Sequence, residues 1–171
     1  MTPTWAIQGR NGRVDVHVGP PVRAAGDDGT PMELLTAEFV AELSAPGYFK
    51  GASTVRVVAL DLVRFHRELG GMVAGRTANA TLGSLGDEVG LTLDAAADSG
   101  ARLSGFIGAG LANAVSFNDV RVDHAALLRS YAALDGLACA VVGYAVLAGG
   151  ERDAPQSGDA RPAADVPGSG V

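Results

Sequence analysis

The sequence is poor in the residue types that carry most protein chemistry. It has one Cys, one Trp and three His in 171 residues, and Lys50 is its only lysine. A single cysteine cannot close a disulfide within the chain, and this length supports a core without metal or disulfide staples. The histidines, His17, His66 and His124, lie far apart in the sequence, and no HxxxH or CxxC spacing suggests a metal site. We therefore expect no metal and no cofactor.

Long apolar runs are also missing. The longest apolar stretch, Leu137 to Ala148, has twelve residues, whereas a helix needs about 20 to cross a bilayer. The N-terminal residues lack the basic and apolar regions of a secretory signal. These absences predict a cytoplasmic protein without a membrane partner, in which Cys139 is a small buried residue.

Acidic residues outnumber basic ones. The chain has 13 Lys and Arg against 19 Asp and Glu, a formal charge of −6. Because such a field repels phosphates on average, the balance argues against nucleic acid and favours a basic or neutral protein partner.

Motifs for catalysis are scarce as well. No GxSxG elbow, P-loop or EF-hand pattern occurs in the sequence. The Gly-rich segment Gly105 to Gly110 resembles the start of a dinucleotide-binding loop, but Asn113 stands where the third glycine belongs. The segment also suits a strand whose glycines let another backbone approach closely. We expect a non-catalytic protein, with a small-ligand or nucleotide-binding enzyme subunit using residues 105–110 as the alternative.

The chain reads as a single α+β domain over residues 1–148. Residues 4–18 are predicted to form an N-terminal hairpin around the Asn11-Gly12 turn, and residues 19–32 a loop rich in Pro, Gly and Asp. Residues 149–171 are predicted to be a disordered tail, because Pro, Gly, Ser, Ala and Asp dominate them.

Apolar periodicity places strands and helices in the body of the domain. Period-two alternation predicts strands over 35–43, 54–60, 89–93, 103–107 and 115–122, the last with a β-bulge near Asn118 and Asp119. Three-to-four spacing predicts helices after Asp61 and after Asp123, each of which can serve as an N-cap. The run 137–147 fits a helix or a buried strand equally well. The sum is an antiparallel sheet of about seven strands with two helices packed on one face.

Two of these strands carry carboxylates on their outward sides. Glu38 and Glu42 share one strand, and Glu88 and Asp94 share another. If both strands lie in one sheet, the four carboxylates form an acidic face. Such a face could dock a cationic partner, or it could be a solvated surface that prevents edge-to-edge aggregation.

The order of segments resembles a known family. The stretches that carry the likeness are Leu35 to Gly47, Val55 to Leu69, Leu82 to Leu85 and Val89 to Ala95, followed by a hairpin, a strand and a C-terminal helix. This order is similar to the bacterial wall-associated-protein immunity proteins and an allied family of unknown function from high-GC bacteria. The resemblance implies a small cytoplasmic α+β protein that binds and blocks the toxic tip of a contact-dependent antibacterial protein.

Taken together, these patterns predict a non-catalytic intracellular binding protein. The resemblance makes its partner a cognate toxin domain, for which the carboxylates of Glu38, Glu42, Glu88 and Asp94 are the predicted contact residues. A purely oligomeric structural protein, with edge strands pairing between subunits, is a third possibility. The sequence leaves the oligomeric state open.

Overall fold

The computed structural model describes residues 4–44, 48–97, 100–108 and 114–150, and for 142–150 it describes the backbone alone. Four strands and a helix follow one another twice along the chain. The first set is β1 (Thr4–Gln8), β2 (Gly12–Ala25), β3 (Pro31–Leu43), β4 (Phe49–Val58) and α1 (Ala59–Val73). The second set is β5 (Asn79–Gly83), β6 (Val89–Ala95), β7 (Ala101–Ile107), β8 (Val115–Val122) and α2 (His124–Gly150).

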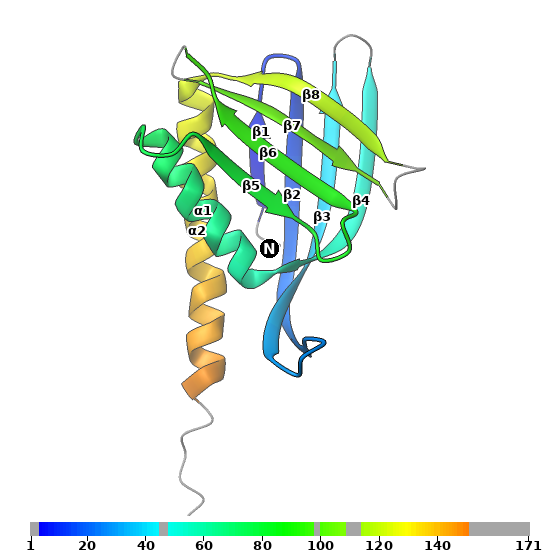
Figure 1. The fold of residues 1–171 in the computed structure, drawn as a ribbon, viewed down its shortest axis with the longest axis vertical. Helices are drawn as coiled ribbons and strands as arrows, with labels where there is room; N and C mark the ends of the chain where they lie inside the picture. The colour runs from blue at the N-terminus through cyan, green and yellow to red at the C-terminus, as the bar shows by residue number, and fades with distance from the viewer. Residues whose placement is uncertain (1–3, 45–47, 98–99, 109–113, 151–171) are drawn as a thin grey trace, which may run out of the picture.

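Each set of four strands forms its own antiparallel sheet. The first sheet has the order β1-β2-β3-β4, and the second has the order β5-β6-β7-β8. In Figure 1 the strands of the second sheet cross those of the first, and both helices lie along the same side of the two sheets. The α+β class, the two helices and the antiparallel pairing are confirmed, while the single sheet of about seven strands is replaced by two sheets of four.

One strand has almost no signal in the sequence. Strand β5 has five residues, of which only Ala80 and Leu82 point inward. Two apolar positions are too few to establish an alternation. The helices then pack where the sheets meet, with α1 against β5, α2 against β1, and the two helices against each other.

The core lies between the two sheets and the helices. Strand β3 shows the pattern that builds it, because Leu35, Ala37, Phe39 and Ala41 are buried while Thr36, Glu38 and Glu42 are exposed. Trp5 joins the first sheet to α2: its indole Nε1 donates to the Ser130 hydroxyl at 2.8 Å and to the Ser130 carbonyl at 3.0 Å. The Trp5 ring also meets Phe65 of α1 edge-on, with centroids 5.4 Å apart.

Of the two residues predicted to cap a helix, Asp123 does so and Asp61 does not. Helix α1 begins at Ala59, so Asp61 lies in its first turn, 3.1 Å from Arg64, and is not the N-cap. Asp123 does cap α2, since its Oδ1 accepts the Ala126 N–H at 2.8 Å.

The ambiguous run 137–147 is helical, and Cys139 lies on an exposed side of α2 rather than in the core.

The loop predicted for residues 19–32 is mostly strand. Strand β2 continues to Ala25 and pairs with β3 from Pro31 onward, after a register shift between Val18 and Pro21. The turn itself covers residues 26–30, where Gly29 adopts a positive φ of 78°.

The predicted tail lies, from residue 151 onward, outside the described residues. Within the described part of the chain, neither helix has both the length and the hydropathy to cross a bilayer.

Candidate functional site

The outer face of the second sheet, meaning the side turned away from the first sheet, is built from small polar residues. Strand pairing sets them in three rows across β5 to β8. One row holds Thr81, Thr92 and Ser104; the next holds Gly83, Gly90, Phe106 and Ser116; the last holds Asn79, Asp94, Arg102 and Arg121. Apart from Phe106, the residues in the first two rows are glycines or have short side chains.

Phe106 is the aromatic residue on this face. It lies half-buried opposite Gly90, and its ring covers that glycine: a Cβ at Gly90 would lie 2.5 Å from Phe106 Cε1. Gly83 lies beside Gly90 in the register. The glycine pair therefore lets the ring lie against the sheet while part of it stays exposed to solvent.

Sequence reasoning overlooked Phe106, although a signal was present. Leu103 and Ile107 point into the core, so Phe106 falls on the polar side of its strand together with Arg102 and Ser104. Phe106 is an aromatic residue on the outward side of its strand, and no described helix or sheet covers that side. Such a residue is a candidate contact for a ligand.

Three arginines gather at the end of the second sheet. Arg10, Arg102 and Arg121 line a hollow of about 160 Å³ between the ends of β6 and β8, the start of β7 and the β1–β2 turn; we call it the arginine hollow. Arg102 and Arg121 are register partners on β7 and β8, and the Arg10 N–H donates to the Arg121 carbonyl at 2.8 Å. Backbone pairing thus holds cations from positions 10, 102 and 121 together.

Two of the three arginines in the arginine hollow have no ion-pair partner among the described side chains. Among the described residues, the side chains of Arg10 and Arg121 form no hydrogen bond or ion pair, and Arg102 Nε lies 3.4 Å from Asp119 Oδ1. Asp123 also lines the hollow, but its Oδ1 is engaged in capping α2. The lining therefore carries three cations and one carboxylate, and two further carboxylates, Asp94 and Asp119, stand beside Arg102 at its edge.

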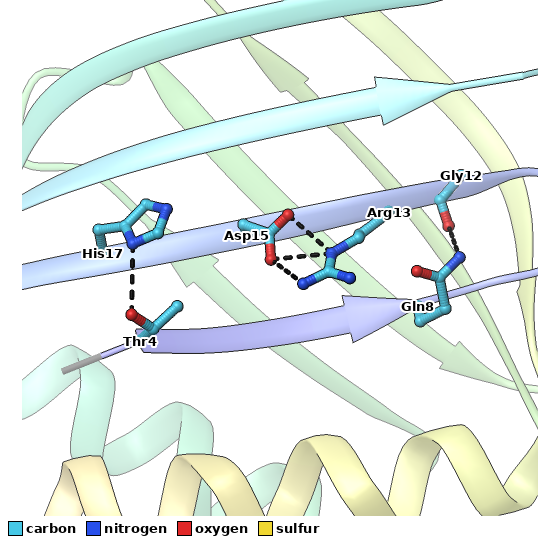
Figure 2. A network of polar contacts seen from close by, with 6 residues as sticks. All are labelled: Thr4, Gln8, Gly12, Arg13, Asp15 and His17. Atoms are coloured by element: carbon cyan, nitrogen blue, oxygen red, sulfur yellow. Dashed lines mark hydrogen bonds and ion pairs between the residues drawn. The ribbon is translucent and has the colours of Figure 1, made fainter.

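Polar side chains on the outer face of the first sheet pair with one another at two places. Arg13 forms two short contacts with Asp15, at 2.6 and 2.7 Å, and this hydrogen bonding raises the pKa of Arg13 (Figure 2). His17 Nδ1 lies 3.3 Å from the Thr4 hydroxyl on the neighbouring strand (Figure 2). Arg13, Asp15 and His17 thus each have a partner on this face.

The structure separates the four carboxylates predicted to form an acidic face. Glu38 and Glu42 lie on β3 of the first sheet, whereas Asp94 lies on β6 of the second and Glu88 precedes that strand. Glu42 stands in register between Arg13 and Lys50, and Glu38 between His17 and Thr54. Asp94 stands opposite Arg102. No common acidic surface results, because each carboxylate has a cation or a hydroxyl beside it or belongs to another sheet.

Tyr48 adds a further partner for Glu42. The hydrogen bond between the two side chains raises the pKa of the Tyr48 phenol, because ionised Tyr48 would lose the bond and repel the carboxylate. Glu42 is therefore engaged on three sides.

The remaining candidates from the sequence do not assemble into a second site. His66 stacks on Tyr131 across the α1–α2 contact, with centroids 5.0 Å apart, and its Nε2 lies 3.0 Å from Asp135 Oδ1. Among the described residues, no three His, Cys, Asp or Glu side chains group closely enough to hold a metal ion.

The Gly-rich segment is part of a strand. Gly105 lies within β7, where a Cβ would collide with the Gly90 carbonyl oxygen, so its role is close backbone approach, as one of the two interpretations expected. Strand β7 pairs directly and antiparallel with β8. A dinucleotide-binding unit needs a crossover to a parallel strand, so the segment does not begin a dinucleotide-binding loop of that kind. Gly110 lies outside the described residues.

The architecture defines a class: an α+β protein made of two consecutive four-strand-and-helix units. No protein-family model and no curated protein matches the sequence. Solved structures similar to this chain include WHY1 from Arabidopsis thaliana, with TM-score 0.48 and 15% identity over 89% of this chain and 98% of that one. The plant transcriptional regulator PBF-2 has TM-score 0.47 and 15% identity over 92% of this chain and 91% of that one. MRP1/MRP2 from Trypanosoma brucei has TM-score 0.41 and 16% identity over 85% and 87%. Similarity at this level leaves the function to be argued from the chain's own side chains.

Two predictions about the partner are corrected. The immunity function, with its cationic toxin partner, is wrong: the carboxylates that motivated it lie in two separate sheets and form no common acidic face. The exclusion of nucleic acid is wrong too, because it was inferred from the net charge alone. That exclusion used the charge of the whole chain, whereas a ligand meets the local field of the arginine hollow.

Proposed function

We propose that the protein binds single-stranded nucleic acid on the outer face of the second sheet. The observation that carries the proposal is the combination, on one flat face, of the partly exposed Phe106 ring with Arg102 and Arg121, of which Arg121 has no partner among the described side chains. An unpaired base can stack on the ring, and the arginines can neutralise phosphates at the end of the face. A cytoplasmic location, which the sequence analysis predicts, belongs to this proposal.

The shape of the face favours a single strand over a duplex. Reading a duplex requires a helix or a ribbon that enters a groove, and the rows of Gly, Ser and Thr project nothing of that size. A flat sheet with an exposed aromatic ring instead suits bases that are already unstacked. The hydroxyls of Thr81, Thr92 and Ser104 can donate to or accept from base edges and sugars along the way.

A binding measurement with Phe106→Leu tests the proposal. Leucine keeps an apolar side chain over Gly90 but offers no flat ring, so the affinity for a fluorescently labelled single-stranded oligonucleotide should fall about 5- to 100-fold, the range of one base–aromatic stack. Fluorescence anisotropy at low salt, with both DNA and RNA strands, gives the dissociation constant.

Tyr48→Ala is the matched control, because Tyr48 is an exposed aromatic residue outside the second sheet. The affinity of this variant should equal that of the unmodified protein. Failure of the unmodified protein to bind either strand, or equal losses of affinity in Phe106→Leu and Tyr48→Ala, would contradict the proposed site.

A further inference from the structure

The arginine hollow differs from the rest of the outer face in shape and in charge. The rest of the face carries mostly uncharged residues, whereas the hollow has a volume of about 160 Å³ and three arginines in its lining. A cavity of about 150 Å³ can hold a benzene molecule, so the hollow is large enough for a compact group such as a phosphate.

We propose that the arginine hollow receives the terminal phosphate monoester of the bound strand. This inference rests on the proposed function, and it assigns a specific chemical group to one end of that surface. A monoester phosphate carries close to two negative charges at neutral pH and three acceptor oxygens, whereas an internal diester carries one charge. Three arginines in one small hollow fit the terminal group better, because each guanidinium can donate two parallel hydrogen bonds to phosphate oxygens.

The position of the hollow agrees with a strand end. Arg102 and Arg121 form the last outward row of β7 and β8, and Phe106 lies four residues along β7 from Arg102. At about 3.3 Å per residue the two sites are separated by about 13 Å. A strand stacked on Phe106 that follows β7 in this direction reaches the hollow and runs off the sheet beyond it.

Arg10 makes the hollow more than an extension of the face. It comes from the β1–β2 turn of the first sheet, and its backbone N–H is fixed to the Arg121 carbonyl. Its side chain has no partner among the described residues. An internal phosphate on the outer face needs Arg102 and Arg121 only, whereas a group seated in the hollow also meets Arg10.

Three forms of one oligonucleotide separate the possible sources of the phosphate: a 5′-phosphate, a 3′-phosphate, and hydroxyls at both ends. One phosphorylated form should bind at least about tenfold more tightly than the unphosphorylated form, the size of one or two charge-assisted hydrogen bonds. In Arg10→Gln the ratio between the two affinities should fall to about one, because the phosphorylated strand loses more affinity than the unphosphorylated strand.

Asp119→Asn provides a test in the opposite direction. The variant removes the carboxylate beside Arg102, and asparagine tolerates the positive φ of 59° at this position. The preference for the phosphorylated strand should therefore increase, whereas Arg56→Gln, which removes an exposed arginine from the first sheet, should leave it unchanged.

The outcomes separate the two proposals. Equal affinity for all three strands, combined with weaker binding in Phe106→Leu, overturns the terminal-phosphate inference and leaves the proposed function standing. A preference that survives Arg10→Gln also overturns the inference. Absence of binding to every strand overturns both.

Discussion

At some positions of this protein, the space left by the neighbouring backbone determines which residue can be accommodated. Gly105 is the clearest case, since a side chain there would meet the Gly90 carbonyl oxygen on the neighbouring strand. Gly136 shows the reverse, because nothing lies within 4 Å of a Cβ built on it in α2. The same residue type is therefore required at one position and merely tolerated at the other.

The same substitution should have opposite effects at these two glycines. Gly105→Ala should lower the free energy of unfolding by about 1–3 kcal/mol, because β6 and β7 must move apart. Gly136→Ala should raise it by about 0.5–1 kcal/mol, because alanine restricts the unfolded chain and favours the helix. Urea denaturation followed by the fluorescence of Trp5, the single tryptophan, measures both. A loss of stability in both variants would show that α2 is packed on its Gly136 side.

Among the elements, α2 connects the two halves of the molecule. It follows β8 of the second sheet, contacts β1 of the first, and holds the Trp5 indole through Ser130. It also packs on α1, where the Tyr131 ring lies so close to Gly70 that a Cβ there would come within 2.9 Å of Tyr131 Cε2. The start of α2 therefore bears on the stability of the whole domain.

Removing the cap of α2 should be measurable as a loss of stability. In Asp123→Ala the Ala126 N–H loses its acceptor, and the free energy of unfolding should fall by about 1 kcal/mol. Asp123→Asn keeps an oxygen acceptor, so its stability should stay near that of the unmodified protein. Thermal and urea denaturation check both variants, and equal losses would mean that the charge of Asp123 matters rather than the cap.

At the scale of the whole molecule, the candidate site depends on how the two sheets are joined. The β1–β2 turn lies against β8: a Cβ at Gly9 would come within 2.5 Å of Val120 Cγ1 and 2.7 Å of the Arg121 carbonyl oxygen. This close contact brings Arg10 to Arg121. Local strand pairing alone cannot do so, because the two residues belong to different sheets.

Gly9→Ala should separate the turn from the second sheet. We expect the free energy of unfolding to fall by about 1–3 kcal/mol from overpacking. The preference for a terminally phosphorylated strand should also weaken, since Arg10 moves away from the hollow, while stacking on Phe106 persists. Denaturation combined with the three-strand binding measurement checks this, and an unchanged phosphate preference would show that Arg10 reaches the hollow without the close contact.

Part of this protein is determined locally and was predictable. Alternation in 35–43 and 89–93, the phase slip at Asn118 and Asp119, and the cap at Asp123 all depend on residues close together in the chain, and the structure has each of them. Strand β5 and the helical state of 137–147 were not predictable, because one has too few apolar residues and the other has them on every side.

The candidate site was decided by tertiary structure. The sequence determined which residues point outward on each strand, but outward parity does not say which sheet a strand joins. Strands β3 and β6 belong to different sheets, so their carboxylates do not form the predicted acidic face. The β1–β2 turn packs against β8, and this contact places Arg10 beside Arg102 and Arg121. The net charge of −6 stayed the same throughout. A ligand responds to the charges within its reach, and only the fold sets those distances.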